Sequence, residues 1–453
     1  MTHELRKVGT SAVLVRRLHG KDSMKPARGL IRMELDRRRL MAAGAGLGLA
    51  GVAAARVEAG PRAGMAVGGA TVVLETGTDR PQTDAIQRAI DHSAETGAPV
   101  VLPPGRFVCG ALTLRSSAVL IGAYGCTHLV ARDAAPLISG QGSASLRLEG
   151  LVLDGQGFAE SLVRLEGCGG TLSDCLMSGA REAAIFALDS SGLVVSFNRI
   201  SDCANNGVQV WRSAAGSDGT RILANHIEGV RAAAGGSGQN GNGVNLFRAG
   251  DVQVSGNVIT RCAYSAVRGN AASNMQVISN NCRELGEVAI YAEFGFEGAV
   301  IAQNVVDGAA TGIAVTNFNE GGRLAVVQGN LVRNLKRRPL EPFDKRGEGI
   351  TVEADTIVSG NVIEDAEATG LAIGWGPYMR NVVVTGNIIR NAEVGIGITS
   401  DQAAGTCLID SNIISGARRG AIRALDRGAW IGADLATKET LTARVRISGN
   451  LVA

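Results

Sequence analysis

Several kinds of residue are scarce in this 453-residue chain, and each scarcity excludes a class of function. Aromatic residues make up only 4% of the sequence, and of its five histidines only His226 lies among the Asn repeats described below, which begin at Asn198. A zinc or copper site therefore has almost no ligands to draw on, and no Cys-x-x-Cys pair is present. The net charge is only +3, and much of the basic excess lies in the first 40 residues, which argues against nucleic-acid binding. We expect neither a metal nor another cofactor.

Asparagine recurs along most of the chain with Ile or Val two residues later, mostly at intervals of 23 to 32 residues, as far as Asn450. A fixed period of this size is typical of a stacked solenoid. Asn side chains at one corner of successive coils can hydrogen-bond to each other and to the backbone, so we expect a structural ladder rather than a ligand site. The residues expected in this ladder are Asn198, Asn225, Asn257, Asn304, Asn330, Asn361, Asn387 and Asn412.

Short alternating strands run in phase with the Asn repeat. Eight or nine residues after most of the repeat Asn positions, a small residue begins such a strand, as in Gly312-Ile313-Ala314-Val315. Apolar residues at every second position indicate a strand with one buried face. Three short strands per coil, with Gly and Asn at the corners, predict an all-β fold, a single-stranded right-handed parallel β-helix of about 11–12 coils over residues 60–453. A short helix near residues 83–96 is expected to cap the first coil.

The amino-terminal segment has the pattern of an export signal. Arg37 and Arg38 precede a Gly/Ala-rich apolar run, as in twin-arginine leaders, although Asp36 stands where Ser or Thr is common. The alternative, a membrane anchor, is disfavoured because roughly 16 residues diluted with Gly are short for a membrane span. We predict a leader over residues 1–59, with Met33 as a candidate true start. The expected partner is the twin-arginine export machinery, and the expected location is periplasmic or secreted, with no stable membrane anchor after cleavage.

The eight cysteines would suggest disulfide bonds in an exported protein. Cys203 and Cys262, however, both lie five residues after a repeat Asn, where other coils have Ala. That position is expected inside the coil. We therefore favour buried free thiols over disulfide bonds or metal ligation.

The first part of the repeat region resembles known families. Residues 83–114, with a helical pattern followed by Pro103-Pro104-Gly105, resemble the opening of pectin-lyase-like β-helix proteins. Together with the leader and the Asn/Gly-Ile coils, residues 33–453 resemble the twin-arginine-translocated, uncharacterised right-handed β-helix repeat family. The resemblance implies the fold and export, and it implies no particular activity.

One motif resembles part of a glycosidase pattern. Residues 151–157, Leu-Val-Leu-Asp-Gly-Gln-Gly, are similar to an early motif of polygalacturonase-type enzymes. The later Asn-Thr-Asp, Asp-Asp and Gly-His-Gly motifs are absent, as is the Asp-Pro-His arrangement of alginate epimerases. By its phase Asp154 is expected at the Asn position of its coil, so we interpret it as a turn residue.

The outward positions of the strands that follow each small residue carry polar and aromatic side chains in the middle coils. Parallel stacking places equivalent residues of neighbouring coils about 4.8 Å apart. Two insertions, around residues 228–242 and 333–348, are expected to stand as walls on either side of this band. The candidate site residues in the band are Trp211, Asn245, Phe247, Arg268, Asn270, Tyr291, Glu293 and Glu353.

Two chemistries fit these residues. Glu293 and Glu353 are two coils apart, hence roughly 9–10 Å, near the upper end of the about 6.5–9.5 Å used by inverting glycosidases. One would act as general acid while the other activates water. Alternatively, Arg268 would neutralise a uronate carboxylate while Tyr291 removes a proton, which gives β-elimination. A purely structural ion pair between Glu293 and Arg268 also stays open.

The remaining candidates are expected to bind substrate. Trp211 and Phe247 would stack against sugar rings, with Asn245 and Asn270 beside them. We therefore predict an exported carbohydrate-active protein, a polysaccharide hydrolase or lyase, with a polysaccharide or other glycan as its partner. The alternatives are a non-catalytic glycan-binding protein and a structural surface or periplasmic repeat protein.

Overall fold

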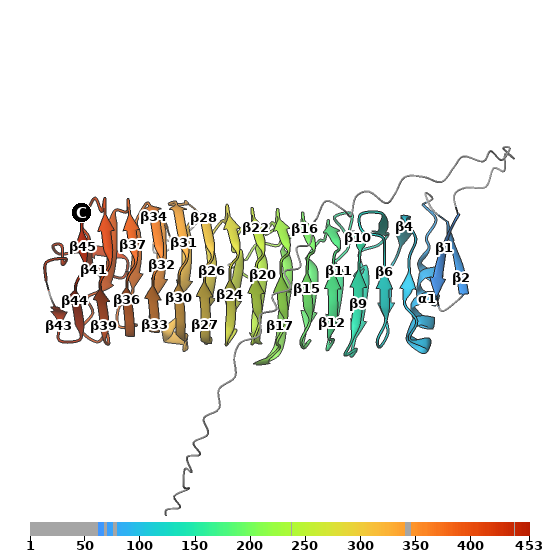
Figure 1. Cartoon of the computed structure of the whole chain (residues 1–453), viewed down its shortest axis with the longest axis horizontal. Helices are drawn as coiled ribbons and strands as arrows, with labels where there is room; N and C mark the ends of the chain where they lie inside the picture. The colour runs from blue at the N-terminus through green and yellow to red at the C-terminus, as the bar shows by residue number, and fades with distance from the viewer. Residues whose placement is uncertain (1–61, 68–69, 76–78, 237, 340–345, 439) are drawn as a thin grey trace, which may run out of the picture. The chain divides into compact units, whose positions relative to one another are not determined.

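The computed structural model describes residues 62–67, 70–75, 79–236, 238–339, 346–438 and 440–453. The predicted leader, with Met33, Arg37 and Arg38, lies outside these residues. The described chain winds into a parallel β-helix in which each coil gives one short strand to each of three sheets (Figure 1). The predicted all-β, parallel β-helix fold is confirmed. One 14-stranded sheet has 13 parallel strands, since only its last strand is antiparallel, so the helix has about 13 coils rather than 11–12.

The three sheets account for all strands of the described residues. Sheet A consists, in spatial order, of β2 (Ala70–Glu75), β1 (Arg62–Val67), β3 (Val100–Val101), β6 (Val119–Ile121), β9 (Leu146–Glu149), β12 (Gly170–Ser173), β15 (Val194–Ser196), β18 (Arg221–Leu223), β21 (Gln253–Ser255), β24 (Met275–Ile278), β27 (Glu297–Ala302), β30 (Arg323–Gln328), β33 (Ala354–Ser359), β36 (Arg380–Thr385), β39 (Cys407–Asp410), β44 (Val445–Ser448) and β43 (Thr440–Thr442). Sheet B consists of β4 (Gly105–Cys109), β7 (Thr127–Ala131), β10 (Leu151–Asp154), β13 (Leu176–Ser178), β16 (Arg199–Ser201), β19 (His226–Glu228), β22 (Val258–Thr260), β25 (Asn281–Arg283), β28 (Val305–Ala309), β31 (Leu331–Leu335), β34 (Val362–Ala366), β37 (Ile388–Arg390), β40 (Ile413–Ser415) and β45 (Leu451–Val452). Sheet C consists of β5 (Leu112–Leu114), β8 (Ile138–Gln141), β11 (Ser161–Glu166), β14 (Ala183–Leu188), β17 (Asn206–Ser217), β20 (Asn242–Gly250), β23 (Val267–Asn270), β26 (Val288–Glu293), β29 (Thr311–Val315), β32 (Glu348–Val352), β35 (Thr369–Ile373), β38 (Val394–Thr399), β41 (Ile422–Asp426) and β42 (Ala429–Ile431).

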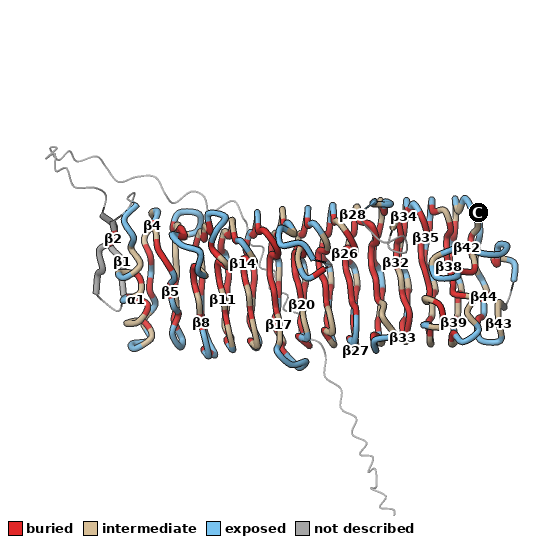
Figure 2. The backbone as a smooth tube through the Cα atoms, turned by 180° about the vertical axis from the view of Figure 1, so that it is seen from behind, coloured by how far each residue is buried: buried red, intermediate tan, exposed pale blue. Residues whose placement is uncertain are grey.

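The core is a continuous apolar column inside the coils. Buried residues recur from coil to coil along the helix (Figure 2). Successive coils pair in register, so Val267 stacks on Ile290 and Ile290 stacks on Ile313. Side chains on either side of each such residue along the strand point to the opposite face of the sheet. The alternation of the sequence therefore fixes which residues fill the core and which reach the outer face of sheet C.

The first coil is covered by α1 (Thr83–Thr96), whose Ile86, Ala89 and Ile90 are buried. The helix ends at Gly97, which adopts the left-handed conformation (φ 73°) that glycine tolerates. The predicted capping helix near residues 83–96 is thus confirmed, and it covers apolar surface that an end coil would expose. Within the described residues, no helix is long and apolar enough to cross a membrane.

The repeat asparagines form a hydrogen-bonded ladder at the corner between sheets A and B. From Asn225 onward, the Oδ1 atom of each ladder Asn accepts hydrogen bonds from the backbone N–H and from Nδ2 of the Asn one coil earlier, as between Asn304 and Asn330 (2.9 and 3.0 Å). Each Nδ2 also donates to a backbone carbonyl, as Asn304 does to Val277 (2.9 Å). The sequence pattern missed one rung, Asn280, because Cys282 stands where Ile or Val was required.

Two smaller expectations have different outcomes. Asp154 is not at the Asn position of its coil, because Val152 pairs with Leu176 and Leu176 pairs with Arg199, which places Leu151 at the position of Asn198. That part of the prediction is wrong, although the Asp154 carboxylate does accept the N–H of Gln156 (2.9 Å) in a turn. All eight cysteines are free thiols, and seven of them, including Cys203 and Cys262, are buried.

Candidate functional site

The predicted band of polar and aromatic residues runs in register along the outer face of sheet C. The first outward positions stack from coil to coil as Asn245 on Arg268 and Arg268 on Tyr291. The second outward positions likewise stack as Phe247 on Asn270 and Asn270 on Glu293. The Asn repeat therefore placed these side chains correctly on one face of the helix.

These outward-facing side chains are nevertheless buried. Arg268, Tyr291 and Glu293 are only 7%, 3% and 1% exposed. Part of the cover comes from the first insertion, which approaches so closely that a Cβ atom at Gly238 would lie 1.9 Å from Nη1 of Arg268. Hydrophobic periodicity indicates which face a residue occupies, and it carries no information about what a loop lays over that face.

Arg268 is the centre of a buried charge cluster. Its Nε and Nη2 donate to the two carboxylate oxygens of Glu293 (2.6 and 2.9 Å), and its Nη1 donates to Glu287 (2.8 Å). Asn270 Nδ2 also donates to Glu293 (3.2 Å). Burial alone would lower the pKa of Arg268, but the bond to Glu293 and the charges of both glutamates leave that pKa above its ordinary value. Arg268 and Glu293 therefore form the ion pair that was one of the alternatives left open by the sequence.

Two pockets lie on this face, and the predicted catalytic residues are divided between them. The first, of about 320 Å³, contains Glu353 and is called the Glu353 pocket. The second, of about 370 Å³, contains Trp211 and is called the Trp211 pocket; Arg268 and Glu293 belong to it. Tyr291 lines the Glu353 pocket, and the Arg268 guanidinium packs 5.0 Å from the centre of the Tyr291 ring. The stacked pair of Arg268 and Tyr291 thus forms part of the partition between the two pockets.

Glu353 follows the last residue of β32 and is held by a turn from the neighbouring coil. Its Oε2 accepts the backbone N–H of Phe318 (2.6 Å), at the start of the 3-10 helix η1 (Phe318–Glu320). Asn317 adopts a left-handed conformation (φ 68°), and its N–H also faces the carboxyl group. Burial has the largest effect and raises the pKa of Glu353 to about 7, against the two N–H groups, which lower it. Near neutral pH this carboxyl group can both hold and release a proton.

The other walls of the Glu353 pocket come from segments that the sequence prediction did not single out. Trp375 and Tyr378 lie on a tight turn whose two ends exchange backbone hydrogen bonds (3.2 and 3.0 Å). Leu425, on β41 of the β41–β42 hairpin, lines another side of the Glu353 pocket. Trp375, the second residue of Gly-Trp-Gly-Pro-Tyr, was detectable, because an aromatic pair around Gly-Pro stands out in a chain with 4% aromatic residues.

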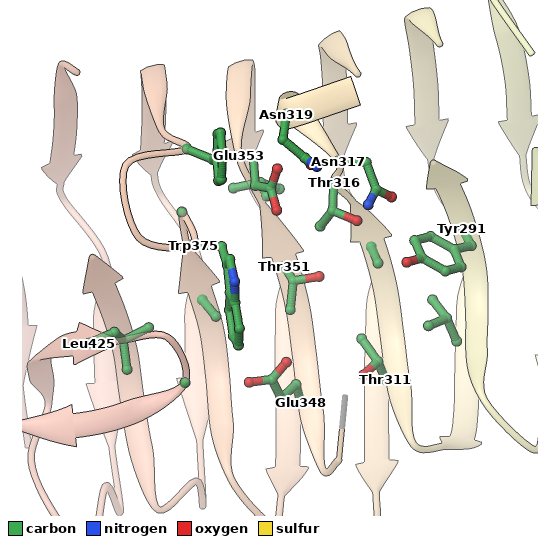
Figure 3. A pocket seen from close by; sticks show the side chains of 17 residues that line it. Tyr291, Thr311, Thr316, Asn317, Asn319, Glu348, Thr351, Glu353, Trp375 and Leu425 are labelled. Carbon is green, nitrogen blue, oxygen red and sulfur yellow. The ribbon is translucent and has the colours of Figure 1, made fainter. Parts of the chain in front are cut away.

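Polar groups line the pocket from end to end. Figure 3 shows Glu353 and Glu348 at opposite ends, with Thr351 between them and the Trp375 ring alongside. Glu348, at the start of β32, is 8% exposed. The buried hydroxyl of Thr311, which also lines the pocket, has no hydrogen-bond partner in the described part of the chain. Among the described lining residues there is no Lys or Arg.

The two insertions contribute unequally. Gly238 and Gln239 of the first insertion line the Trp211 pocket, as expected of a wall. From the second, only Glu348 among the described residues lines the Glu353 pocket, and residues 340–345 lie outside the described chain. Over the ranges that the structure describes, no group of three or more His, Cys, Asp or Glu side chains is arranged to hold a metal ion.

Known proteins match this chain at the level of fold. A family model described as "Right handed beta helix region" matches residues 161–332. The catalytic unit of the thermostable GH87 alpha-1,3-glucanase from Streptomyces thermodiastaticus strain HF3-3 is similar, with a TM-score of 0.56 and 16% identity over 83% of this chain and 66% of that one. The N-terminal fragment of bacteriophage phi29 gene product 12 is similar with a TM-score of 0.51 and 16% identity, over 83% of this chain and 69% of that one. No curated protein matches. These matches agree with the right-handed parallel β-helix fold, and the chain spans about two thirds of these solved structures.

Proposed function

We propose that this protein is a carbohydrate-active enzyme that hydrolyses a neutral glycan in the Glu353 pocket, with Glu353 as the general acid. The observation that carries the proposal is a buried carboxyl group with a pKa of about 7 in a pocket walled by aromatic rings. Concave sites with aromatic walls and a few convergent polar groups are typical of small-ligand and sugar binding. A general acid works best when its pKa lies near the working pH. A GH87 alpha-1,3-glucanase is built on a similar fold, which makes the fold compatible with this activity.

The charge of the pocket favours a neutral sugar. Glu348 and Glu353 line it, and no described Lys or Arg side chain does. A uronate carboxylate would find no described Lys or Arg side chain there to pair with its charge. Arg268, which the elimination hypothesis requires for uronate binding, already binds Glu293 and Glu287 and lines the other pocket. The geometry therefore favours hydrolysis over β-elimination.

In the proposed reaction the glycosidic C–O bond breaks while Glu353 gives its proton to the leaving oxygen. Water adds to the anomeric carbon and loses its proton to Glu348. The two glutamates are five residues apart along β32, about 16 Å between Cα atoms for an extended strand. This Cα spacing is longer than the about 6.5–9.5 Å between the two carboxyl groups of inverting enzymes, so Glu348 can serve as the base only with both side chains extended toward the bound sugar. Glu293, fixed by Arg268, takes no part.

Replacing Glu353 with Gln is expected to lower turnover about 10²–10⁴-fold, the range for loss of a general acid. The measurement is release of reducing ends from neutral polysaccharides (α-1,3-glucan, xylan, galactomannan) and acidic ones (polygalacturonate, alginate). Glu364→Gln, on the outer face of sheet B, is the control and should leave activity unchanged. Because the protonated fraction of Glu353 falls above its pKa, wild-type activity should fall as the pH rises through about 7. Among the described residues, the other titratable side chains that line the pocket are Glu348, Tyr291 and Tyr378.

Three outcomes would contradict the proposal. Full activity of Glu353→Gln would remove Glu353 from the mechanism. Cleavage of acidic polymers alone, with unsaturated products, would favour elimination. Retention of a glycan without any product would identify a binding protein, the alternative left open by the sequence.

We also propose export by the twin-arginine pathway, which rests on the Arg37-Arg38 pair and the apolar run after it. Replacing both arginines with Lys is expected to stop export and leave the uncleaved precursor in the cytoplasm. Cell fractionation and the mass of the protein in each fraction measure this. Processed protein outside the cytoplasm in the double variant would contradict twin-arginine export.

A further inference from the structure

The Trp211 pocket has features that the proposed reaction does not use. Phe186, Trp211 and Phe247 come from three successive coils of sheet C, and their rings meet edge to face with centroids 5.7 Å apart in each pair. All three side chains are only half-buried. A column of aromatic rings along the helix axis therefore leads to this pocket.

The pocket is held in a fixed shape by polar groups. Trp211 Nε1 donates to Asn245 Oδ1 (3.0 Å), and Asn245 Nδ2 donates to the carbonyl of Gln239 in the first insertion (3.1 Å). On the other side, Asn270 donates to Glu293, which Arg268 fixes in turn (3.2 and 2.6 Å). The indole ring and the two amides are thus positioned before any ligand arrives, which reduces the entropy cost of binding.

We infer that the Trp211 pocket is a second sugar-binding site, which holds a distant part of the same neutral polysaccharide that enters the Glu353 pocket. Both pockets lie on the outer face of sheet C, and they adjoin at the Arg268–Tyr291 stack. Trp211 on β17 and Glu353 after β32 are five coil steps apart, about 24 Å along the axis. A long chain can reach both pockets, whereas a disaccharide can occupy only one. This inference rests on the proposed function for the identity of the ligand.

The guanidinium groups near the column fit the same ligand. Arg164 packs over Phe186 and Arg248 over Phe247, each at 4.7 Å from the ring centre. Arg164 is balanced by ion pairs to Glu160 and Glu166 (2.7 and 2.9 Å), and Arg268 is balanced by Glu293. Two of these three guanidinium groups are ion-paired, and Arg248 donates to the Ser213 carbonyl (2.9 Å). This surface therefore has little preference for an ionic ligand, and its aromatic faces suit the apolar faces of neutral sugar rings.

The test separates binding from turnover. In the Glu353→Gln background, binding to each polysaccharide of the panel is measured by co-sedimentation or affinity electrophoresis, with and without Trp211→Ala. We expect Trp211→Ala to weaken retention of a neutral polysaccharide at least tenfold, and Trp211→Phe, which keeps the ring, to restore most of it. Phe197→Ala removes an exposed aromatic side chain at the corner between sheets A and B and should have no effect.

Turnover gives the second readout. In the otherwise wild-type enzyme, Trp211→Ala should raise KM for the polysaccharide that is cleaved, while kcat and the kinetics on its disaccharide stay unchanged. Equal KM effects on polymer and disaccharide, or unchanged retention by a folded Trp211→Ala protein, would overturn the second site. Retention that depends on Trp211 with no turnover of any polymer would sustain the second site and contradict the proposed hydrolysis, so the two ideas fail separately.

Discussion

Replacing Arg268 with Met is expected to lower the free energy of unfolding by about 3–5 kcal/mol, the usual cost of breaking a buried ion pair from one side. The substitution keeps much of the side-chain volume and removes the guanidinium that both Glu293 and Glu287 bind. Glu293 is 1% exposed and Glu287 is 4% exposed, so water cannot replace these bonds without opening the pocket. Unfolding by denaturant, followed by circular dichroism, measures the loss.

An exposed ion pair provides the matched control. Arg390 and Glu364 also join neighbouring coils (3.3 Å), on the outer face of sheet B, and the Arg390 side chain is 55% exposed. Arg390→Met should therefore cost only about 0–1 kcal/mol. Because a solenoid can open locally without unfolding as a whole, hydrogen exchange of β23 and β26 should also rise in the Arg268 variant. Equal stability of the two variants would show that the buried cluster is no stronger than a surface pair.

The fold was predictable because its rules are local and repeated. Each coil must turn its corners and bury its apolar side chains in the same way, so period and alternation together gave the sheets, the register and the Asn ladder. The same dependence on a fixed pattern caused the errors. The interval of 47 residues between Asn257 and Asn304 contains two coils, which meet at the ladder residue Asn280. The motif missed Asn280 because Cys282 stands two residues later in place of Ile or Val.

The site was only partly predictable, because its walls come from distant parts of the chain. Register placed Arg268, Tyr291 and Glu293 on one face, since stacking follows the period. No period shows that Arg268 pairs with Glu287 as well as Glu293, or that Tyr291 and Glu293 line different pockets. These facts depend on loops whose conformations no repeat determines.

The aromatic wall was missed for a related reason. In the coil of β35 the outward position holds Gly374, a small residue that gives no sign of a pocket wall there. The adjacent turn instead carries Trp375 and Tyr378 into the Glu353 pocket, and the β41–β42 hairpin adds Leu425 from some 50 residues further on. A site built by loops on a regular scaffold must be sought beside the repeat positions as well as on them.

The Asn ladder allows a stability prediction that compares two adjacent asparagines, Asn280 in the ladder and Asn281 outside it. Asn280 is 1% exposed; its Oδ1 accepts two hydrogen bonds from Asn257, from the backbone N–H (3.0 Å) and from Nδ2 (2.9 Å). Its Nδ2 donates to the carbonyl of Val254 and to Asn304 (both 3.0 Å). Asn281, the next residue, is only partly buried, and its Oδ1 accepts one bond from Arg283 (2.9 Å).

Asn280→Ala is expected to lower the free energy of unfolding by about 2–4 kcal/mol, because buried polar groups such as the Asn257 N–H lose their partner at about 1–3 kcal/mol each. Asn281→Ala, the matched control in the same coil, should change it by no more than about 0.5 kcal/mol. Denaturant unfolding compares the two, and hydrogen exchange should show faster opening of β22 and β25 only in the Asn280 variant. The prediction fails if the two substitutions cost the same. In that case stacking of the apolar core would hold the coils together without help from the corner amides, and the Asn repeat would reflect turn geometry alone.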